Sequence, residues 1–176
     1  MIKKKLNFLI ILSLILFVFF SLLLGLNKNN YYSTEKIMNS KLENFQGVDL
    51  YSNKNINFSE VSRSENFTLI NIWASWCLPC KKEHAFLLDL NKNYNLVMIG
   101  INYKDNIENA KSFILNLGNP YDFIIKDYKG FIAIELGAYG VPETYLIRNS
   151  NNEILKKYIG PINEKKLKEI KSIIKK

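Results

Sequence analysis

The chain has 176 residues, enough for one domain with a terminal extension, and 48% of them are hydrophobic, which can supply a sizeable core. Its 24 Lys and Arg residues outnumber 16 Asp and Glu residues, giving a formal net charge of +8. Nearly all the basic residues are lysines, which are spread along the chain with clusters at both ends and are not interleaved with aromatic residues. This pattern favours a solvated surface, or one facing anionic lipid, over nucleic-acid binding.

The first segment is almost wholly apolar between residues 6 and 26. As a helix it would span roughly 30 Å, the thickness of a bilayer core. Lysines at positions 3–5 precede it, so the positive-inside rule keeps the amino terminus in the cytoplasm and the rest of the chain outside. A cleaved signal peptide is the alternative, but its apolar run is usually about 7–15 residues, and no small-x-small site precedes Asn27. We therefore expect residues 1–26 to form cytoplasmic lysines and an uncleaved transmembrane anchor.

The next segment, residues 27–40, is rich in Asn, Lys, Ser and Tyr and has no apolar periodicity. It predicts a flexible tether of roughly 20 Å. Residues 41–176 then form the globular domain. That domain opens with Phe45–Ser59, a predicted hairpin around the turn-rich Tyr51–Asn55.

Two cysteines follow the most apolar part of this domain. Phe67–Trp73 predicts a buried strand, and helical spacing begins at Pro79, a residue suited to a first helical turn. Cys77 and Cys80 would therefore lie at a strand-to-helix junction, at the positive end of the helix dipole. That field favours the thiolate and can lower a cysteine pKa from about 8.5 to roughly 3.5–7.5.

The spacing of the cysteines allows both sulfurs to lie within one helical turn. Cys77 is expected to be the exposed nucleophile, and Cys80 the shielded thiol that resolves a mixed disulfide. A zinc site needs about four ligands, and only His84 could join the cysteines. A structural disulfide over so short a loop removes little chain entropy, and two free buried thiols suit a cytosolic protein better. Redox chemistry without a metal or a bound cofactor is the favoured interpretation.

Strand and helix patterns alternate through the rest of the chain, which predicts right-handed crossovers and parallel pairing. A mixed central sheet, with helices on both faces and the cysteine pair at the first strand–helix junction, resembles the thioredoxin fold, an α/β class. The expected strands are Leu96–Ile101, Phe123–Ile125, and a hairpin of Thr144–Arg148 with Ile154–Tyr158; the expected helices are Ile107–Leu117, Phe131–Leu136 and Glu164–Ile174.

Four segments narrow the resemblance. Trp73-Ala-Ser-Trp-Cys-Leu-Pro-Cys80 resembles the thioredoxin-like motif, and Gly140-Val-Pro-Glu-Thr-Tyr-Leu-Ile147 resembles the segment that places a cis-proline opposite the cysteines. Together with Asn102–Asp105 and Leu117–Tyr121, they are similar to the CcmG/DsbE family, membrane-anchored thiol:disulfide interchange proteins of cytochrome c maturation. The similarity extends over roughly residues 67–161. A reductase role is implied by this resemblance, not by spacing or composition.

The resemblance also implies roles for residues outside the cysteine pair. Pro142 would follow a cis peptide bond, leaving the backbone of Val141 to pair with an extended substrate strand. Glu143 and Glu83 match acidic positions of the family motifs, where a carboxylate would raise a cysteine pKa and could shuttle a proton. The alternative for each is a solvated surface charge.

Several further positions bear on the site. Asn71 stands where thioredoxin carries a buried acid, and since an amide cannot accept that proton, the role shifts to Glu143 or water. Trp76 is expected at a partly exposed rim of the site. Tyr103 and Asp105 would follow a strand end near this rim, where Tyr103 could contact a partner. His84 is interpreted as a helix-face residue without a catalytic role.

These expectations define a membrane-tethered disulfide reductant on the outer side of the cytoplasmic membrane. By the resemblance, its partners would be apocytochrome c or a cytochrome c maturation thiol protein, and a membrane electron-conduit reductase would re-reduce it. One alternative is a general exported dithiol oxidant or reductase, although no histidine separates the cysteines as in strong oxidants. Another is a non-catalytic interaction domain that retains the fold.

Overall fold

The computed structural model describes residues 2–26 and 38–175. The chain divides into two compact units, residues 1–33 and residues 34–176. In the first unit, helix α1 (Ile2–Leu26) contains a 19-residue stretch, Asn7–Gly25, that is long and apolar enough to cross a membrane. The side chains of this stretch are exposed and pack against no core. The helix therefore fits a membrane anchor better than a core helix of a globular domain.

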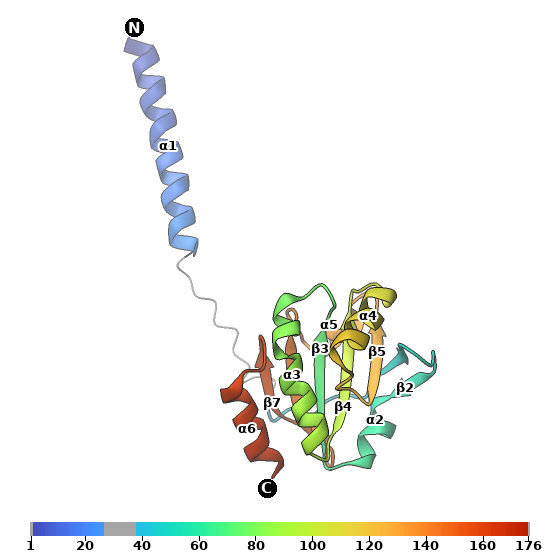
Figure 1. Ribbon diagram of the computed structural model, residues 1–176. Helices are drawn as coiled ribbons and strands as arrows, with labels where there is room; N and C mark the ends of the chain where they lie inside the picture. The colour runs from blue at the N-terminus through green and yellow to red at the C-terminus, as the bar shows by residue number, and fades with distance from the viewer. Residues whose placement is uncertain (1, 27–37, 176) are drawn as a thin grey trace. The chain divides into compact units, whose positions relative to one another are not determined.

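The globular unit is built on one seven-stranded sheet of order β2-β1-β5-β4-β3-β6-β7 (Figure 1). The central strands β3, β4 and β5 are parallel, and the other neighbouring pairs are antiparallel. This arrangement confirms the predicted thioredoxin-like fold. The strands are β1 (Gln46–Asp49), β2 (Asn55–Asn57), β3 (Phe67–Trp73), β4 (Val97–Tyr103), β5 (Phe123–Asp127), β6 (Glu143–Arg148) and β7 (Glu153–Ile159).

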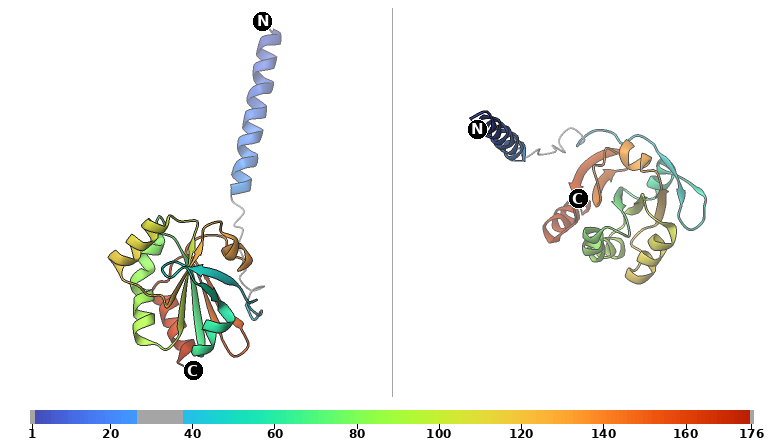
Figure 2. Two further views of the ribbon diagram at one scale, coloured as in Figure 1. Left: turned by 90° about the vertical axis from the view of Figure 1, so that its right-hand side faces the viewer. Right: turned by 90° about the horizontal axis from the view of Figure 1, so that it is seen from above.

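Helices cover both faces of the sheet (Figure 2). On one face, three longer helices bury residues such as Leu90, Ile114 and Ile170 against the sheet. On the other face, two short helices bury Phe58 and Ala133. The helices are α2 (Phe58–Val61), followed by a 3-10 turn (Ser62–Ser64), α3 (Leu78–Asn93), α4 (Ile107–Leu117), α5 (Phe131–Glu135) and α6 (Glu164–Ile174).

The ends of these elements follow local side-chain chemistry. The predicted hairpin forms between β1 and β2, but β2 ends at Asn57 because the side chain of that residue caps α2 by accepting from the Ser59 N–H. Asn106 caps α4 in the same way, and α4 ends at Gly118, whose φ of 91° suits glycine. β5 runs two residues further than predicted, since Lys126 pairs with Val48 of β1.

The predicted tether lies mostly outside the described residues, which resume at position 38. Asn39 donates its N–H to the Ile154 carbonyl at 2.9 Å, and the Ile154 N–H donates to the Ser40 carbonyl at 2.9 Å. Asn39 and Ser40, at the start of the described part of the globular unit, are therefore hydrogen-bonded to β7.

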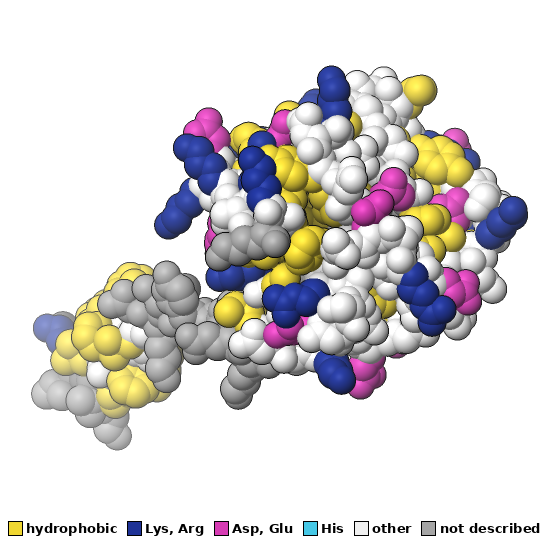
Figure 3. Space-filling model, turned by 90° about the horizontal axis from the view of Figure 1, so that it is seen from below, with side chains coloured by type: hydrophobic (Ala, Val, Ile, Leu, Met, Phe, Trp, Pro, Cys, Tyr) yellow, Lys and Arg dark blue, Asp and Glu magenta, His cyan; other side chains and the backbone are white. Residues whose placement is uncertain are grey.

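The surface of the globular unit carries both signs of charge. On the face shown in Figure 3, Lys and Arg side chains are interspersed with Asp and Glu. The globular unit also has partly exposed ion pairs, such as Lys156 with Glu169 at 2.9 Å and Arg148 with Glu153 at 2.6 Å. Such pairs contribute little to stability but keep the surface solvated, as the composition predicts.

Candidate active site

The cysteine pair lies where the sequence predicts it, between β3 and α3. Cys77 is the N-cap of α3, and Pro79 falls within the first turn, where its missing N–H leaves no unpaired group. The two cysteines form a disulfide, with their Cα atoms 5.3 Å apart. The site is thus shown in its oxidised form, at the positive end of the α3 dipole.

The predicted exposure of Cys77 is wrong for this form. Cys77 is 4% exposed and Cys80 2%, so both are buried and differ little. The reason is the N-cap geometry, in which the Cys77 sulfur turns back over the helix and accepts a hydrogen bond from the Cys80 N–H at 3.1 Å. The neighbours Trp76 and Leu78 are the exposed side chains, at 59% and 65%.

The loop that leads into Cys77 is held by Asp105. This buried carboxylate accepts from the Ser75 N–H at 2.6 Å and from the Ser75 hydroxyl at 2.7 Å. It also accepts from the Asn102 side-chain amide at 3.0 Å. Asp105, which the sequence places near the rim, therefore holds the loop residue Ser75 two positions before Cys77. Trp76 is fixed as well, since its indole N–H donates to the Lys104 carbonyl at 3.2 Å.

A polar network lies in the core one turn into α3. Glu83 is fully buried and accepts from the Asn71 side-chain amide at 2.9 Å and from the Ile162 N–H at 2.6 Å. Asn71 in turn donates to the Thr144 hydroxyl at 3.0 Å and accepts from the Tyr121 hydroxyl at 2.7 Å. All the donors that contact the carboxylate are neutral.

Burial raises the pKa of Glu83 from 4.5 to about 7, against the opposing effect of its two hydrogen bonds and of the more distant Lys166. The interpretation of Glu83 as a solvated charge is therefore wrong. Glu83 follows Cys80 by three residues on the same buried face of α3. A buried acid that exchanges its proton near neutral pH thus lies within one helical turn of the disulfide.

Glu143 is also buried, at 1% exposure, but its surroundings differ. Its carboxylate forms an ion pair with the buried ammonium of Lys157 at 2.9 Å. It also accepts from the N–H groups of Tyr139 and Gly140, at 2.8 and 3.2 Å. The solvated-charge interpretation is wrong here too. The carboxylate is occupied by the loop that precedes it and by a cation that the sequence interpretation missed.

The remaining predicted residues lie around this end of the sheet. The peptide bond between Val141 and Pro142 is cis, as the resemblance implies. Pro142 is buried, and Val141 is partly buried and packs against the core that contains the cysteines. Tyr103 is partly buried at the end of β4, with the Lys104 ammonium 5.2 Å from its ring centroid. None of these positions identifies a substrate.

His84 belongs to the core. It is 3% exposed, its Nε2 lies 2.8 Å from the Gly118 carbonyl oxygen, and burial lowers its pKa. Its ring also packs edge-on against Phe113. Among the described residues, no three His, Cys, Asp or Glu side chains are grouped as a metal site would need.

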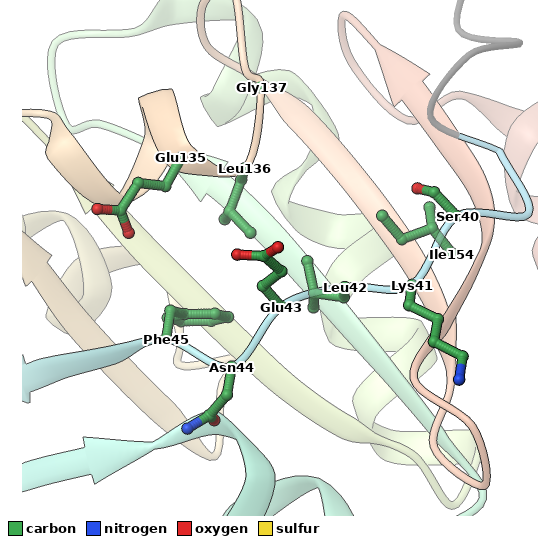
Figure 4. A pocket seen from close by; sticks show the side chains of 10 residues that line it. All are labelled: Ser40, Lys41, Leu42, Glu43, Asn44, Phe45, Glu135, Leu136, Gly137 and Ile154. Carbon is green, nitrogen blue, oxygen red and sulfur yellow. The ribbon is translucent and has the colours of Figure 1, made fainter.

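A cavity of about 340 Å³ lies elsewhere in the domain (Figure 4). It is lined by residues 40–45, by the end of α5 and the two residues after it, and by Ile154 of β7. None of the site residues predicted from the sequence is among them. The cysteine site is therefore separate from this cavity.

Comparison with known proteins agrees with this geometry. The Redoxin family matches residues 38–174. The thiol:disulfide interchange protein DsbE-2 of Pasteurella multocida is 35% identical over 161 residues, covering 91% of this chain and 84% of that protein. The chain belongs to the Redoxin family, among its DsbE-type thiol:disulfide interchange proteins.

Other DsbE-type relatives match a shorter segment. The thiol:disulfide interchange protein CycY of Rhizobium leguminosarum is 48% identical over 102 residues, which cover 58% of this chain and 54% of that protein. DsbE of Escherichia coli K12 is 40% identical over 95 residues, 54% of this chain and 50% of that protein. The chain thus spans about half the length of these two relatives.

Solved structures show the same fold at low sequence identity. A DsbE-type protein from Chlorobium tepidum superposes with a TM-score of 0.67 at 19% identity, covering 78% of this chain and 96% of that one. A DsbF homologue from Corynebacterium diphtheriae superposes with a TM-score of 0.66 at 20% identity, covering 76% of this chain and 86% of that one. These likenesses support the fold alone.

Proposed function

We propose that this protein is a membrane-anchored thiol:disulfide oxidoreductase that reduces disulfides in cytochrome c biogenesis. The observation that carries the chemistry is the Cys77–Cys80 disulfide at the start of α3, one turn from a buried acid. The names of the DsbE and CycY relatives support thiol:disulfide interchange. The cytochrome c role rests on the resemblance of the motifs.

The reaction begins from the dithiol form. The Cys77 thiolate attacks one sulfur of the substrate disulfide, forming a mixed disulfide and releasing the first substrate thiolate. Cys80, once deprotonated, attacks the Cys77 sulfur, which re-forms the Cys77–Cys80 disulfide and releases the second thiolate. Two electrons pass to the substrate, and the protein ends in the oxidised form. An external dithiol reductant, the membrane electron-conduit reductase, must then restore the thiols.

We assign the proton of Cys80 to Glu83. The two residues lie one turn apart on α3, and a pKa of about 7 lets the carboxylate accept a proton at neutral pH. Glu143 is less suited to this role because its carboxylate is held by Lys157 and by two backbone N–H groups. Val141, Trp76 and Tyr103 are assigned to the surface that receives the substrate, next to the buried Pro142.

The layout of the chain is part of the same proposal. Residues 1–26 would hold the protein in the cytoplasmic membrane, residues 27–40 would tether it, and residues 41–176 would work on the extracytoplasmic (periplasmic) side. Support comes from the apolar helix α1 and the lysines before it. In intact cells, a reducing agent that does not cross membranes should open the Cys77–Cys80 disulfide, and a maleimide that does not cross membranes should then label the thiols. Labelling only after the cells are broken would place the domain inside.

A trapping experiment tests the reaction. In the full-length protein, Cys80→Ser should accumulate a mixed disulfide through Cys77, and mass spectrometry of the adduct identifies the substrate. Cys77→Ser is the matched control and should trap nothing. An adduct that forms through Cys80 instead would contradict the assignment of the nucleophile.

Two further measurements separate the alternatives. Equilibration with glutathione should give a potential well below that of strong oxidants, and a value near about −120 mV would favour a general exported oxidant. Cells that carry Cys77→Ser should fail to assemble cytochrome c without added thiols. Normal assembly in those cells would favour a non-catalytic interaction domain.

A further inference from the structure

Helix α5 and the turn before it expose an apolar stripe to solvent. Phe131 and Ile134 lie one turn apart on the outer side of the helix and are 62% and 61% exposed. Tyr128, in the turn between β5 and α5, is 75% exposed. The inner side of the helix is buried, since Ala133 packs in the core against the sheet. A single exposed apolar side chain is ordinary, but three within one short segment indicate a surface that contacts another apolar phase or molecule.

Two exposed lysines lie beside this stripe. The Lys129 ammonium lies 6.0 Å from the ring centroid of Phe131, and the Lys104 ammonium lies 5.2 Å from that of Tyr103. The two segments meet at Gly130, where a Cβ atom would lie 2.6 Å from both the Lys104 side chain and the Tyr103 ring. We call the resulting patch of apolar side chains and lysines the α5 surface: Tyr103, Lys104, Tyr128, Lys129, Phe131 and Ile134.

The acidic side chains nearest in sequence do not neutralise these lysines. Asp105 and Asp127 are buried and accept hydrogen bonds from within the domain, such as those from the Ser75 and Ala133 N–H groups. Glu135 is exposed, but at the opposite end of α5, where it lines the cavity of Figure 4. Among the described residues, neither lysine of the α5 surface forms an ion pair. The outward charge at the beginning of α5 is therefore positive.

The segment that enters the domain, residues 38–45, runs on the same face of the sheet as α5. Its Leu42 and Phe45 pack in the same part of the core as Ala133 of α5, and the segment and the end of α5 line one cavity (Figure 4). Only twelve residues separate the last residue of α1 from Asn39, and a chain of that length reaches at most about 45 Å. With α1 in the membrane, the face that carries α5 stays within reach of the lipid headgroups.

We propose that the α5 surface docks on the surface of an anionic bilayer. Phe131 and Ile134 enter the boundary between headgroups and acyl chains, and Lys104 and Lys129 contact lipid phosphates. Aromatic residues and lysines around an aliphatic centre are the composition that the membrane interface favours. So small a patch binds lipid weakly by itself, but the anchor supplies a high effective concentration of bilayer. The inference rests on the proposed anchor and adds that the domain lies on the membrane.

Docking in this way fixes the place of the cysteine site. The Lys104 carbonyl accepts from the Trp76 indole N–H at 3.2 Å, and Cys77 follows Trp76 directly. The disulfide therefore lies next to the lipid-facing surface. A reductase embedded in the membrane can reach it there after each turnover, without movement of the domain away from the bilayer.

Fluorescence of the full-length protein in lipid vesicles tests the docking. Ile134→Cys, labelled with nitrobenzoxadiazole while the Cys77–Cys80 disulfide is closed, places a probe on the α5 surface. Leu115→Cys is the matched control, because Leu115 is 84% exposed on α4, which covers the other face of the sheet. In vesicles of phosphatidylcholine and phosphatidylglycerol with brominated acyl chains, the probe at position 134 should be quenched about threefold more than the probe at 115.

Variants separate the two kinds of contact. Each lysine that reaches an anionic surface strengthens binding about fivefold, so Lys104→Glu with Lys129→Glu should abolish the extra quenching at position 134. Lys92→Glu with Lys111→Glu, on α3 and α4, is the matched charge reversal and should leave the quenching unchanged. Phe131→Ser should weaken quenching even in vesicles of phosphatidylcholine alone. Charge reversal at positions 104 and 129 that leaves the quenching intact overturns the role of the lysines.

Flotation of the vesicles distinguishes failure of this inference from failure of the proposed anchor. Protein that floats with the vesicles but is quenched equally at positions 134 and 115 keeps the anchor and overturns the docking. Protein that does not float overturns the anchor. A probe at 134 that is shielded from water without lipid quenching, and more so at higher protein density, would assign the α5 surface to a second copy of this chain and overturn the lipid assignment.

Discussion

Replacing Glu83 by glutamine should reverse the order of stability of wild type and variant between acidic and alkaline pH. The side chain is fully buried, the two groups that donate to it, the Asn71 amide and the Ile162 N–H, are neutral, and burial raises its pKa from 4.5 to about 7. The folded protein therefore holds this proton more tightly than the unfolded chain. The stability that the proton supplies is complete below pH 4.5 and is lost as the pH rises through 7.

The expected size of the effect follows from the shift. Burial raises the pKa of Glu83 from 4.5 to about 7, and each pKa unit corresponds to about 1.4 kcal/mol. Keeping the ionised carboxylate buried therefore lowers the free energy of unfolding by about 3 kcal/mol at alkaline pH. A glutamine has no proton to lose. It does present an NH2 group to one of the two donors that the carboxylate accepts from, which costs about 1–2 kcal/mol at every pH. At pH 5 the carboxyl of the unfolded chain is already mostly ionised, so about 1 kcal/mol is lost and wild type should be the more stable by up to about 1 kcal/mol. At pH 8.5 Glu83→Gln should be the more stable by about 1–2 kcal/mol.

Urea unfolding of the full-length protein in detergent measures the effect, with the disulfide intact and the fluorescence of the buried Trp73 as the signal. Glu65→Gln, which removes an exposed carboxylate, is the matched control and should follow the wild type at both pH values. If the curves of wild type and Glu83→Gln stayed parallel from pH 5 to pH 8.5, the pKa of this carboxyl would be the same in the folded and the unfolded protein. The assignment of the Cys80 proton to Glu83 would then fail with it.

Three other substitutions test the packing around the site by the same unfolding assay. Gly100→Ala places a methyl group 2.8 Å from the Trp73 indole nitrogen and 3.0 Å from the Tyr121 ring, so it should destabilise by about 1–3 kcal/mol; an unchanged midpoint would mean that both rings move freely. Tyr121→Phe removes the hydroxyl that donates to Asn71 and should cost about 1–3 kcal/mol, and a neutral result would mean that water replaces it. Asn106→Ala removes the cap of α4 and should cost about 1 kcal/mol, whereas Asn106→Asp, which keeps the acceptor, should cost far less.

The fold and the cysteine pair could be predicted because their signals are local. The apolar run of β3, the proline in the first turn of α3 and the spacing of Cys77 and Cys80 all lie within fourteen positions, from 67 to 80. The periodicity of the apolar residues is enough to place most of the helices. The cis bond before Pro142 came from the resemblance, since nothing in the residues themselves distinguishes it from a trans bond.

Burial of the acidic residues could not be predicted in the same way. In the sequence, Glu83 is an ordinary polar position of a helix. Its burial depends on distant residues, since one of its hydrogen-bond donors, the Ile162 N–H, lies 79 positions away along the chain. Lys157 reads as one of several lysines near the C-terminus, although the tertiary structure places it inside the domain. A helix or strand pattern shows which face carries charge, but only the packed neighbours decide whether a charge on the inner face has a partner.

The sequence assigns the same role to the two buried carboxylates, Glu83 and Glu143. Their contacts in the structure show that the two differ. Glu143 faces a cation and two backbone donors from its own loop, so its charge is compensated in place and the carboxylate is suited to holding structure. No cation among the described residues is in contact with Glu83, and its two neutral donors do not fully offset burial, so it gains and loses a proton near pH 7. Closing a disulfide from two thiols releases protons, and an acid of this second kind, one turn below Cys80, is suited to take one. The same contrast explains why neutralising Glu143 alone should destabilise the fold by leaving the Lys157 ammonium buried without its partner, whereas neutralising Glu83 should alter the dependence of the reaction on pH.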